Sequence, residues 1–229
     1  MGLFEKKYLL SLGVAFYPEK EMLRLEKQAA KGWEFEKLNI FGFLVFKKGV
    51  PQNRQYAVDY FSGKSEDLSE YLEMYQISGW QKVSDFRKKY YFFSADKDTP
   101  SIFSDEESYR EKFKLEWRYN FLRSLIYALF GFIVLVAISF IQAAEWPVPN
   151  GLLLFIAFFG LFGVFFPIGI FATMLFYKLF YRDRTRYYNQ PDKFAKKQSF
   201  IRDQSILLII GAVIGAVIGV GFALLFSSL

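Results

Sequence analysis

A run of three acidic side chains could bind a cation. Asp105, Glu106 and Glu107 are consecutive in the chain, and carboxylate oxygens are suitable ligands for calcium or magnesium ions. The same residues are typical of a helix start, because the partial positive charge at a helix N-terminus favours carboxylates. Ser104 and Glu107 also fit the Ser-x-x-Glu pattern of a capping box. We therefore interpret the run as the first turn of a helix and predict no metal site and no cofactor.

The composition removes much of the remaining catalytic chemistry. The chain has no cysteine and no histidine, so it cannot form a cysteine- or histidine-ligated zinc site, a cysteine nucleophile or a Ser-His-Asp triad. Disulfide bonds are excluded for the same reason. We expect the protein not to be an enzyme, and the sequence indicates no catalytic residue.

Long apolar runs in the second half predict three transmembrane helices. About 20 apolar residues are enough to cross a bilayer, and the predicted spans are residues 121–142, 151–177 and 205–227. Arg123 is the one charged residue in them, and its side chain can reach the membrane surface. The second span is longer than a bilayer requires, so it must tilt, overrun the interface or kink at Pro167.

The segment between the second and third spans is basic. Residues 178–203 contain eight lysines and arginines and three aspartates. Because basic loops remain in the cytoplasm, we expect a multi-pass protein of the cell membrane with a cytoplasmic N-terminal domain and an outside C-terminus. The loop is also expected to attract anionic lipid headgroups. Residues 1–118 are nearly neutral, with 20 basic and 19 acidic side chains, which argues against nucleic-acid binding.

Glycine followed by tryptophan occurs twice, as Gly32 with Trp33 and as Gly79 with Trp80. Each pair follows a helical pattern and precedes two strand patterns, and a glycine just past a helix can take the positive φ that ends it. We interpret the pairs as structural corners of two repeats, residues 5–50 and 54–95, each built as strand, helix, strand, strand. The expected fold class is α+β, with both helices on one face of a largely antiparallel sheet.

The last strand of the second repeat is aromatic. Four aromatic residues follow one another from Tyr90 to Phe93, so rings must point to both faces of the sheet. If the helices cover one face, something else must cover the other. We therefore consider Tyr91 and Phe93 a possible interaction face for a protein partner or for a second copy of the chain.

The expected domain organisation has three parts. Residues 1–98 form the cytoplasmic domain, residues 99–118 form a linker and a juxtamembrane helix, and residues 119–229 form the membrane region. No helix-stop signal separates the juxtamembrane helix from the first span, which predicts one continuous helix.

In the third span, Gly211, Gly215 and Gly219 recur every fourth residue. Such a ridge lets another helix approach closely and predicts helix packing, within the chain or between copies.

The order of motifs in the first half resembles a known family. The motifs are Tyr-Pro-Glu-Lys-Glu from residue 17, Lys-Gly-Trp, "VDYF", Ser-Gly-Trp and a closing Tyr-Tyr-Phe. Over about residues 5–95, this order resembles a bacterial membrane-protein family known as domain of unknown function 2812. The resemblance implies a cytoplasmic module tethered to membrane helices, and some members are encoded near PadR-type transcriptional repressors. It implies no catalytic residue.

Two functional hypotheses follow from the sequence. The first is a membrane-anchored cytoplasmic interaction or sensory module, linked to transcriptional regulation, that binds a protein or a small ligand through its aromatic sheet. The second is an oligomeric membrane protein, such as a transporter subunit, a pore component or an immunity-type protein, that acts through its glycine-ridged helices.

Overall fold

The computed structural model describes residues 6–227, except for the side chains of residue 214 and residues 217–227. It divides into two compact units. One comprises Met1–Glu116 with Asp183–Phe200, and the other comprises Trp117–Arg182 with Ile201–Leu229. The segment 183–200, which the sequence placed in a membrane region, therefore belongs to the same unit as the N-terminal domain.

The first sheet contains the strands β1 (Lys6–Leu10), β2 (Trp33–Leu38) and β3 (Phe43–Lys48). Their order is β1-β3-β2, and both pairings are antiparallel. The helix α1 (Pro18–Ala29) follows β1, and Pro18 at its start suits a position where a backbone N–H has no helical partner. α1 buries Met22, Leu25 and Ala29, whose spacing places them on one face of the helix.

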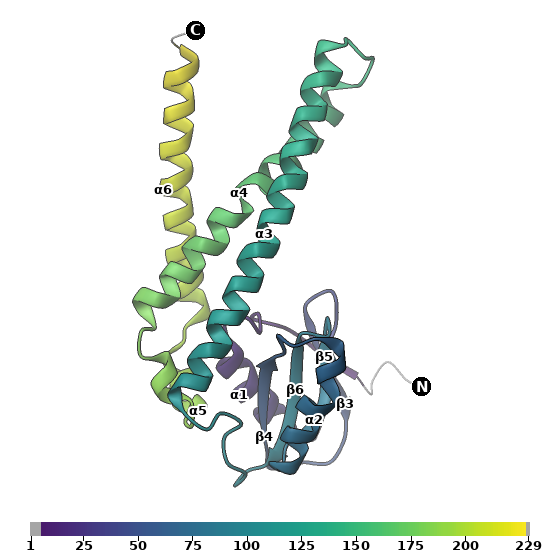
Figure 1. Ribbon diagram of the computed structural model, residues 1–229, viewed down its shortest axis with the longest axis vertical. Coiled ribbons are helices and arrows are strands. Elements are labelled where there is room, and N and C mark those ends of the chain that lie inside the picture. The colour runs from purple at the N-terminus through teal and green to yellow at the C-terminus, as the bar shows by residue number, and fades with distance from the viewer. Residues whose placement is uncertain (1–5, 228–229) are drawn as a thin grey trace. The chain divides into compact units, whose positions relative to one another are not determined.

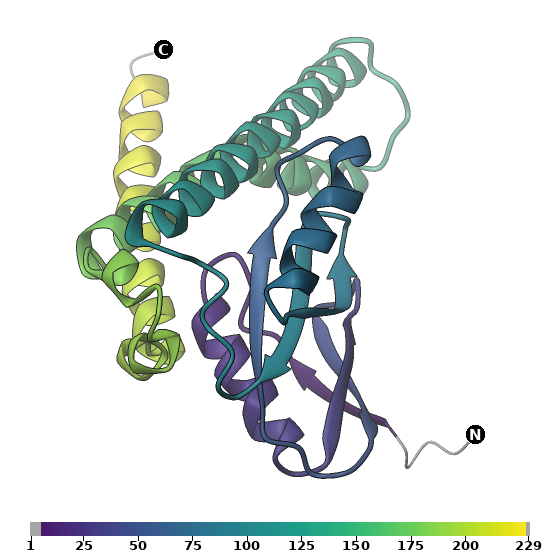
Figure 2. The same cartoon turned by 60° about the horizontal axis from the view of Figure 1, so that its bottom comes forward.

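The second sheet repeats the element order of the first. It contains β4 (Arg54–Tyr60), β5 (Gln81–Phe86) and β6 (Tyr90–Asp96) in the antiparallel order β4-β6-β5. A 3-10 turn (Ser65–Asp67) leads into the helix α2 (Leu68–Ile77), which lies across this sheet (Figure 2). The α+β class is confirmed, but the single expected sheet is wrong. The edge strands β2 and β5 contact each other without forming a common sheet.

The aromatic strand β6 is buried rather than exposed. Tyr91 and Phe93 are 1% and 0% exposed, because α2 places Tyr71 and Tyr75 over them, with the Tyr75 and Phe93 ring centroids 4.4 Å apart. The expectation that Tyr91 and Phe93 form a free interaction face is therefore wrong. On the other side of β6, the Phe92 ring packs against Phe35 of β2, so the first sheet supplies the cover that the sequence did not specify.

Both Gly-Trp corners end a helix with a glycine at positive φ. Gly79 has a φ of +86°, its N–H donates to the Gln76 carbonyl, and the Trp80 N–H donates to the Tyr75 carbonyl. This is the Schellman motif. Gly32 has a φ of +78° but lacks that second bond, because Trp33 already begins β2. The first corner therefore fits the motif less well.

The remaining elements are mainly helical (Figure 1). They are α3 (Glu106–Ala143), α4 (Asn150–Phe180), a 3-10 turn (Arg184–Tyr187), α5 (Pro191–Lys197) and α6 (Phe200–Ser227). By length and composition, α3 and α4 are able to cross a membrane. α3 is continuous from its acidic start, as predicted, and α4 continues through Pro167. A span in α6 stays a prediction.

Glycines bring α3 and α4 into close contact. A Cβ atom added at Gly131 would overlap the Gly160 carbonyl oxygen, and one added at Gly163 would lie 2.8 Å from the Tyr127 carbonyl oxygen. The clashing atoms belong to the backbone, which cannot move aside as the end of a side chain can. These glycines therefore set the separation of the two helices.

We expect Gly131→Ala to destabilise the helix pair. The added methyl group must push the α4 backbone away, and overpacking of this kind costs about 1–3 kcal/mol. Thermal unfolding of the full chain in detergent micelles would measure the loss as a lower melting temperature. Gly169→Ala is the matched control, because its new Cβ meets no atom within 4 Å and alanine favours a helix interior. Equal melting temperatures for the two variants would contradict the role of Gly131.

Candidate functional site

A cavity of about 470 Å³ lies inside the first unit. Its walls come from α1, β4, residues 97–103, the first turns of α3 and residues 188–193. Tyr56, Trp80, Phe103, Tyr109 and Tyr188 contribute aromatic rings, and three lysines and three carboxylates contribute charge. This volume and mixture are typical of a site for a small organic molecule.

A buried ion pair fixes one wall of the cavity. The Arg184 Nε and Nη2 atoms donate to the two Glu19 carboxylate oxygens over 2.6 and 2.9 Å. The side chains are only 5% and 3% exposed. Tyr109 Oη donates to the same carboxylate over 2.6 Å, and Gln198 Nε2 over 3.1 Å. The planar guanidinium matches the carboxylate in two parallel bonds, and its face lies 3.8 Å from the centre of the Phe113 ring.

These bonds determine the charge state of Glu19. Burial alone would raise the pKa of Glu19, but the charge of Arg184 and the hydrogen bonds from Arg184 and Tyr109 hold that pKa below its ordinary value. The pKa of Tyr109 is raised well above its ordinary value by burial and by the nearby Glu19 carboxylate. Glu19 is thus a buried carboxylate that is hydrogen-bonded to its neighbours. It holds segments of the first unit together and is not a free acid.

Lys112 brings a buried positive charge to the cavity wall. It is 7% exposed, donates to the Val58 carbonyl over 2.6 Å, and lies 5.2 to 5.8 Å from the rings of Phe103, Tyr109 and Phe113. Burial lowers its pKa, which the nearby carboxylates of Asp59 and Glu116 partly offset. Lysine side chains are seldom fully buried unless they are paired. Because Lys112 brings a buried positive charge to the cavity wall, it is the lining residue best placed to bind a polar ligand.

Glu116 follows Lys112 by one helical turn and is fully buried. Burial raises the pKa of Glu116 to about 7, although Lys112 and a hydrogen bond from Tyr90 act in the opposite direction. Asp59 follows Val58, the acceptor of the Lys112 bond, in β4, and its carboxylate accepts bonds from Tyr71 and Tyr75 over 2.9 and 2.7 Å. Lys112, which lines the cavity, is therefore coupled to two buried carboxyl groups that do not line it, Glu116 and Asp59.

A second charged group lines the cavity. Lys97 Nζ lies 3.0 Å from a Glu26 oxygen and 3.7 Å from an Asp192 oxygen. Burial raises the pKa of Glu26, against the effect of Lys97. Asp192 belongs to α5, so this group joins α1, the end of β6 and the segment 183–200 around the cavity.

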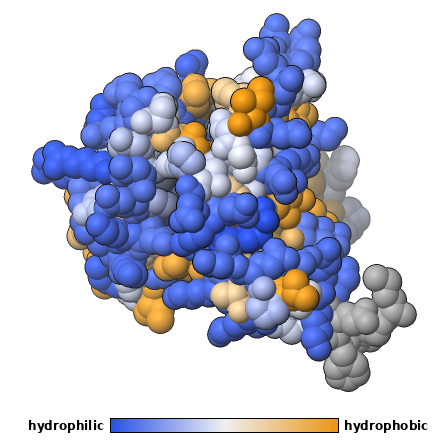
Figure 3. Space-filling model, turned by 90° about the horizontal axis from the view of Figure 1, so that it is seen from below, coloured by the Kyte–Doolittle hydropathy of each residue, from blue (hydrophilic) through white to orange (hydrophobic). Residues whose placement is uncertain are grey.

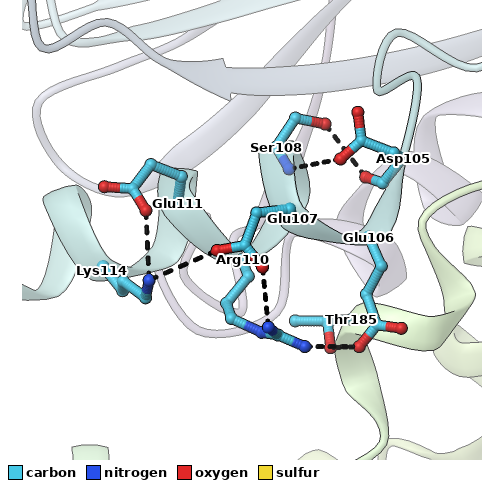
Figure 4. A network of polar contacts seen from close by, with 8 residues as sticks. All are labelled: Asp105, Glu106, Glu107, Ser108, Arg110, Glu111, Lys114 and Thr185. Atoms are coloured by element: carbon cyan, nitrogen blue, oxygen red, sulfur yellow. Dashed lines mark hydrogen bonds and ion pairs between the residues drawn. The ribbon is translucent and has the colours of Figure 1, made fainter.

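Further bonds hold the segment 183–200 in the first unit. Ser101 Oγ donates to the Tyr188 carbonyl over 2.8 Å, and Thr185 Oγ1 donates to Glu106 over 2.7 Å (Figure 4). Lys20 Nζ also donates to the Gln198 carbonyl, and α5 contacts α1. The segment 183–200 is therefore held in the first unit by hydrogen bonds and forms part of the site.

The acidic run at the start of α3 is engaged in structural bonds. Asp105 caps the helix, because its carboxylate accepts the Ser108 N–H over 2.8 Å. The predicted cap, Ser104, is one residue too early for a helix that begins at Glu106. Arg110 pairs with Glu106 and Glu107, and Lys114 pairs with Glu111 (Figure 4). Within residues 6–227, the described side chains include no cluster that could hold a metal ion.

The other sequence-selected residues lie away from the cavity, except Trp80, which lines it. A Cβ atom at Gly211 or Gly215 would meet no atom within 4 Å, so no described part of the chain packs on that ridge. The side-chain position of Gly219 lies outside the described residues. The sequence missed Arg184, which looked like any other cation of the basic loop, because nothing local marks its pairing with a glutamate 165 positions away.

A family model described as "Protein of unknown function (DUF2812)" matches residues 17–126. The chain carries a DUF2812 domain. The predicted resemblance is thus confirmed, although the match begins after β1 and extends into α3 rather than covering residues 5–95. The DUF2812 domain contains Glu19, Lys112 and most of the cavity wall, but residues 184–193 lie outside it. No curated protein and no solved structure matches the chain.

We expect Arg184→Met to destabilise the first unit strongly. Removing one partner leaves the Glu19 carboxylate buried without its cation, and breaking a buried pair in this way costs about 3–5 kcal/mol. Urea unfolding of the full chain in micelles, followed by tryptophan fluorescence, would show a lower midpoint. Adding Glu19→Met to Arg184→Met should recover much of the loss, because the unpaired charge is then absent.

Arg186→Met is the control for this prediction, since Arg186 lies in the same turn but is exposed. We expect the midpoint of this variant to match that of the wild type. If Arg184→Met also left the urea midpoint nearly unchanged, the ion pair between Glu19 and Arg184 would not be what holds the segment 183–200 in the first unit.

Proposed function

We propose that the protein is a membrane-anchored sensory module whose DUF2812 domain binds a small ligand in its cavity. In this proposal α3, α4 and α6 cross the cell membrane, the first unit lies in the cytoplasm, and the C-terminus lies outside. The length and apolar character of α3 and α4 support the anchoring. The eight basic residues between 178 and 203 support the orientation.

The composition of the cavity wall carries this proposal. A ligand in the cavity would touch the DUF2812 domain at α1, β4 and α3, and it would also touch residues 188–193. Those residues lie between the C-terminal end of α4 and the start of α6. Binding that shifts residues 188–193 would therefore act directly on the chain that enters two of the helices, which is the coupling that a sensor requires.

The charge pattern of the cavity favours a polar small molecule over nucleic acid. Its three lysines and three carboxylates balance, whereas nucleic acid needs a basic surface. We extend the proposal to a protein partner, a cytoplasmic regulator that reads the state of the module. The link to transcriptional regulation rests only on the family resemblance.

We expect Lys112→Met to abolish or weaken ligand retention. The methionine keeps most of the volume but removes the buried cation. The full chain, purified in mild detergent, would be denatured, and the released small molecules would be identified by mass spectrometry. A compound held by the wild type should be at least about tenfold depleted in the variant, corresponding to a loss near 1.4 kcal/mol.

Lys114→Met provides the matched control, because Lys114 lies half a turn along the same helix with its side chain 58% exposed. It should retain the compound at the wild-type level. Equal retention by the wild type and both variants would place the ligand elsewhere. If none of the three proteins released a bound compound, that result would contradict the sensory proposal.

The exposed glycines of α6 favour a second candidate, an oligomeric membrane protein. Gly211 and Gly215 leave open space for another helix, which a second copy of the chain would fill in a transporter subunit, a pore component or an immunity-type protein. In that case Gly215→Leu should convert oligomers to monomers in crosslinking of native membranes. An unchanged crosslinking pattern would remove the support for this candidate.

A further inference from the structure

Four large apolar side chains are exposed together at one end of the first sheet. Leu10 ends β1, Phe43 begins β3 directly opposite it, and Ile40 and Phe41 form the turn between β2 and β3. Ile40 and Phe41 are 77% and 76% exposed. We call these four residues the apolar tip. On the face shown in Figure 3, exposed apolar side chains lie scattered among hydrophilic ones.

The apolar tip has a fixed backbone. The Asn39 side-chain oxygen accepts the N–H groups of Phe41 and Phe43 over 3.0 and 2.9 Å. The Gly42 N–H donates to the Asn39 carbonyl, and the Ser11 N–H donates to the Gly42 carbonyl over 2.8 Å. Gly42 has a φ of +81°, which a glycine adopts without strain. The backbone hydrogen bonds therefore hold the Ile40 and Phe41 side chains in solvent. Their exposure to water is unfavourable in free energy, and burying them against a partner would recover that free energy.

The sheet that bears the apolar tip is basic. Its three strands contain five lysines and two glutamates, although residues 1–118 are nearly neutral. Lys6 pairs with Glu36, and Lys47 pairs with Glu34. Lys37, next to the turn, is exposed. Apolar and aromatic side chains flanked by lysines are typical of surfaces that enter an anionic bilayer interface.

Short contacts and a short chain segment link the apolar tip to the point where the chain leaves the first unit for α6. The Tyr17 ring contacts the Phe200 ring at a centroid distance of 5.5 Å, and Phe200 is the first residue of α6. Ser11, bonded to the tip, is six residues from Tyr17, a span of at most roughly 20 Å. If α6 crosses the membrane, the bilayer surface lies within a few turns of Phe200, and the apolar tip is within reach of it.

We infer that the apolar tip inserts into the interface of the anionic bilayer that holds the helices. This inference rests on the membrane anchoring in the proposed function but not on its ligand cavity. The insertion gives the first unit a second attachment to the membrane, made by side chains rather than by chain connections. It restrains how the sensory unit can turn about its helical anchors.

The experiment uses the absence of cysteine from the chain. Phe41→Cys is labelled with a nitroxide in the full chain, which is reconstituted in nanodiscs of phosphatidylcholine and phosphatidylglycerol at 3:1. Collision rates of the label with oxygen and with a water-soluble nickel complex are measured by electron paramagnetic resonance. Oxygen concentrates in lipid and the complex in water, so insertion gives a high oxygen-to-nickel ratio. Ile40→Cys provides a second reading at the same turn.

Two control positions bracket the result. Phe158→Cys on α4 is 64% exposed and reports lipid if the helices span the membrane. Ile77→Cys on α2 is 80% exposed and reports water. We expect the ratio at position 41 to exceed that at position 77 several-fold, and to fall when Lys37→Glu is added or phosphatidylglycerol is omitted.

The outcomes separate this inference from the proposed function. A ratio at positions 40 and 41 equal to that at position 77, with a lipid value at position 158, overturns insertion and leaves the anchoring intact. Spin–spin broadening at position 41 that disappears when labelled chains are diluted with unlabelled ones also overturns it, because a second copy then covers the tip. A water value at position 158 contradicts the membrane anchoring itself and removes the basis of the inference.

Discussion

The buried pair between Glu19 and Arg184 is the interaction on which the rest of the first unit depends. It joins the first turn of α1 to a residue 165 positions further along, after two long apolar helices have intervened. Taking both charges out of water costs several kcal/mol per ion, and only bonds of good geometry offset this cost. The two guanidinium bonds, with those from Tyr109 and Gln198, provide that geometry. One consequence is that the cavity has a complete wall only when the returning segment is in place.

This dependence explains why the family match and the structural unit have different limits. The DUF2812 domain ends within α3 at residue 126, yet the unit that contains the cavity also requires residues 183–200. A DUF2812 domain cut free at the end of its match would leave the Glu19 carboxylate buried without Arg184, or would open to hydrate it. The cavity is therefore complete only in a chain that includes residues 183–200, and the proposed sensory function relies on this.

The sequence predicted local features well because they are determined by neighbouring residues. Hydrophobic periodicity located α1, α2 and most strands, and the glycine corners followed from the φ that Gly32 and Gly79 require. Strand pairing was not predictable in the same way. Alternation of apolar and polar residues shows that one face of a strand is buried, but it does not show which element covers that face. Tyr91 was consequently assigned to a surface although α2 covers it. The cavity was missed because its walls come from distant segments, and Arg184 differs from the other loop arginines only in its partner.

The buried charges coupled to Lys112 connect these features to ligand binding. The coupled groups are two cations, Arg184 and Lys112, and three carboxyl groups, Glu19, Asp59 and Glu116. Burial raises the pKa of Glu116 to about 7, so this carboxyl group is suited to hold a proton. A ligand anion beside Lys112 would compensate that cation and make ionised Glu116 less favourable. Ligand binding and proton uptake at Glu116 should therefore favour each other, since linkage of this kind is reciprocal.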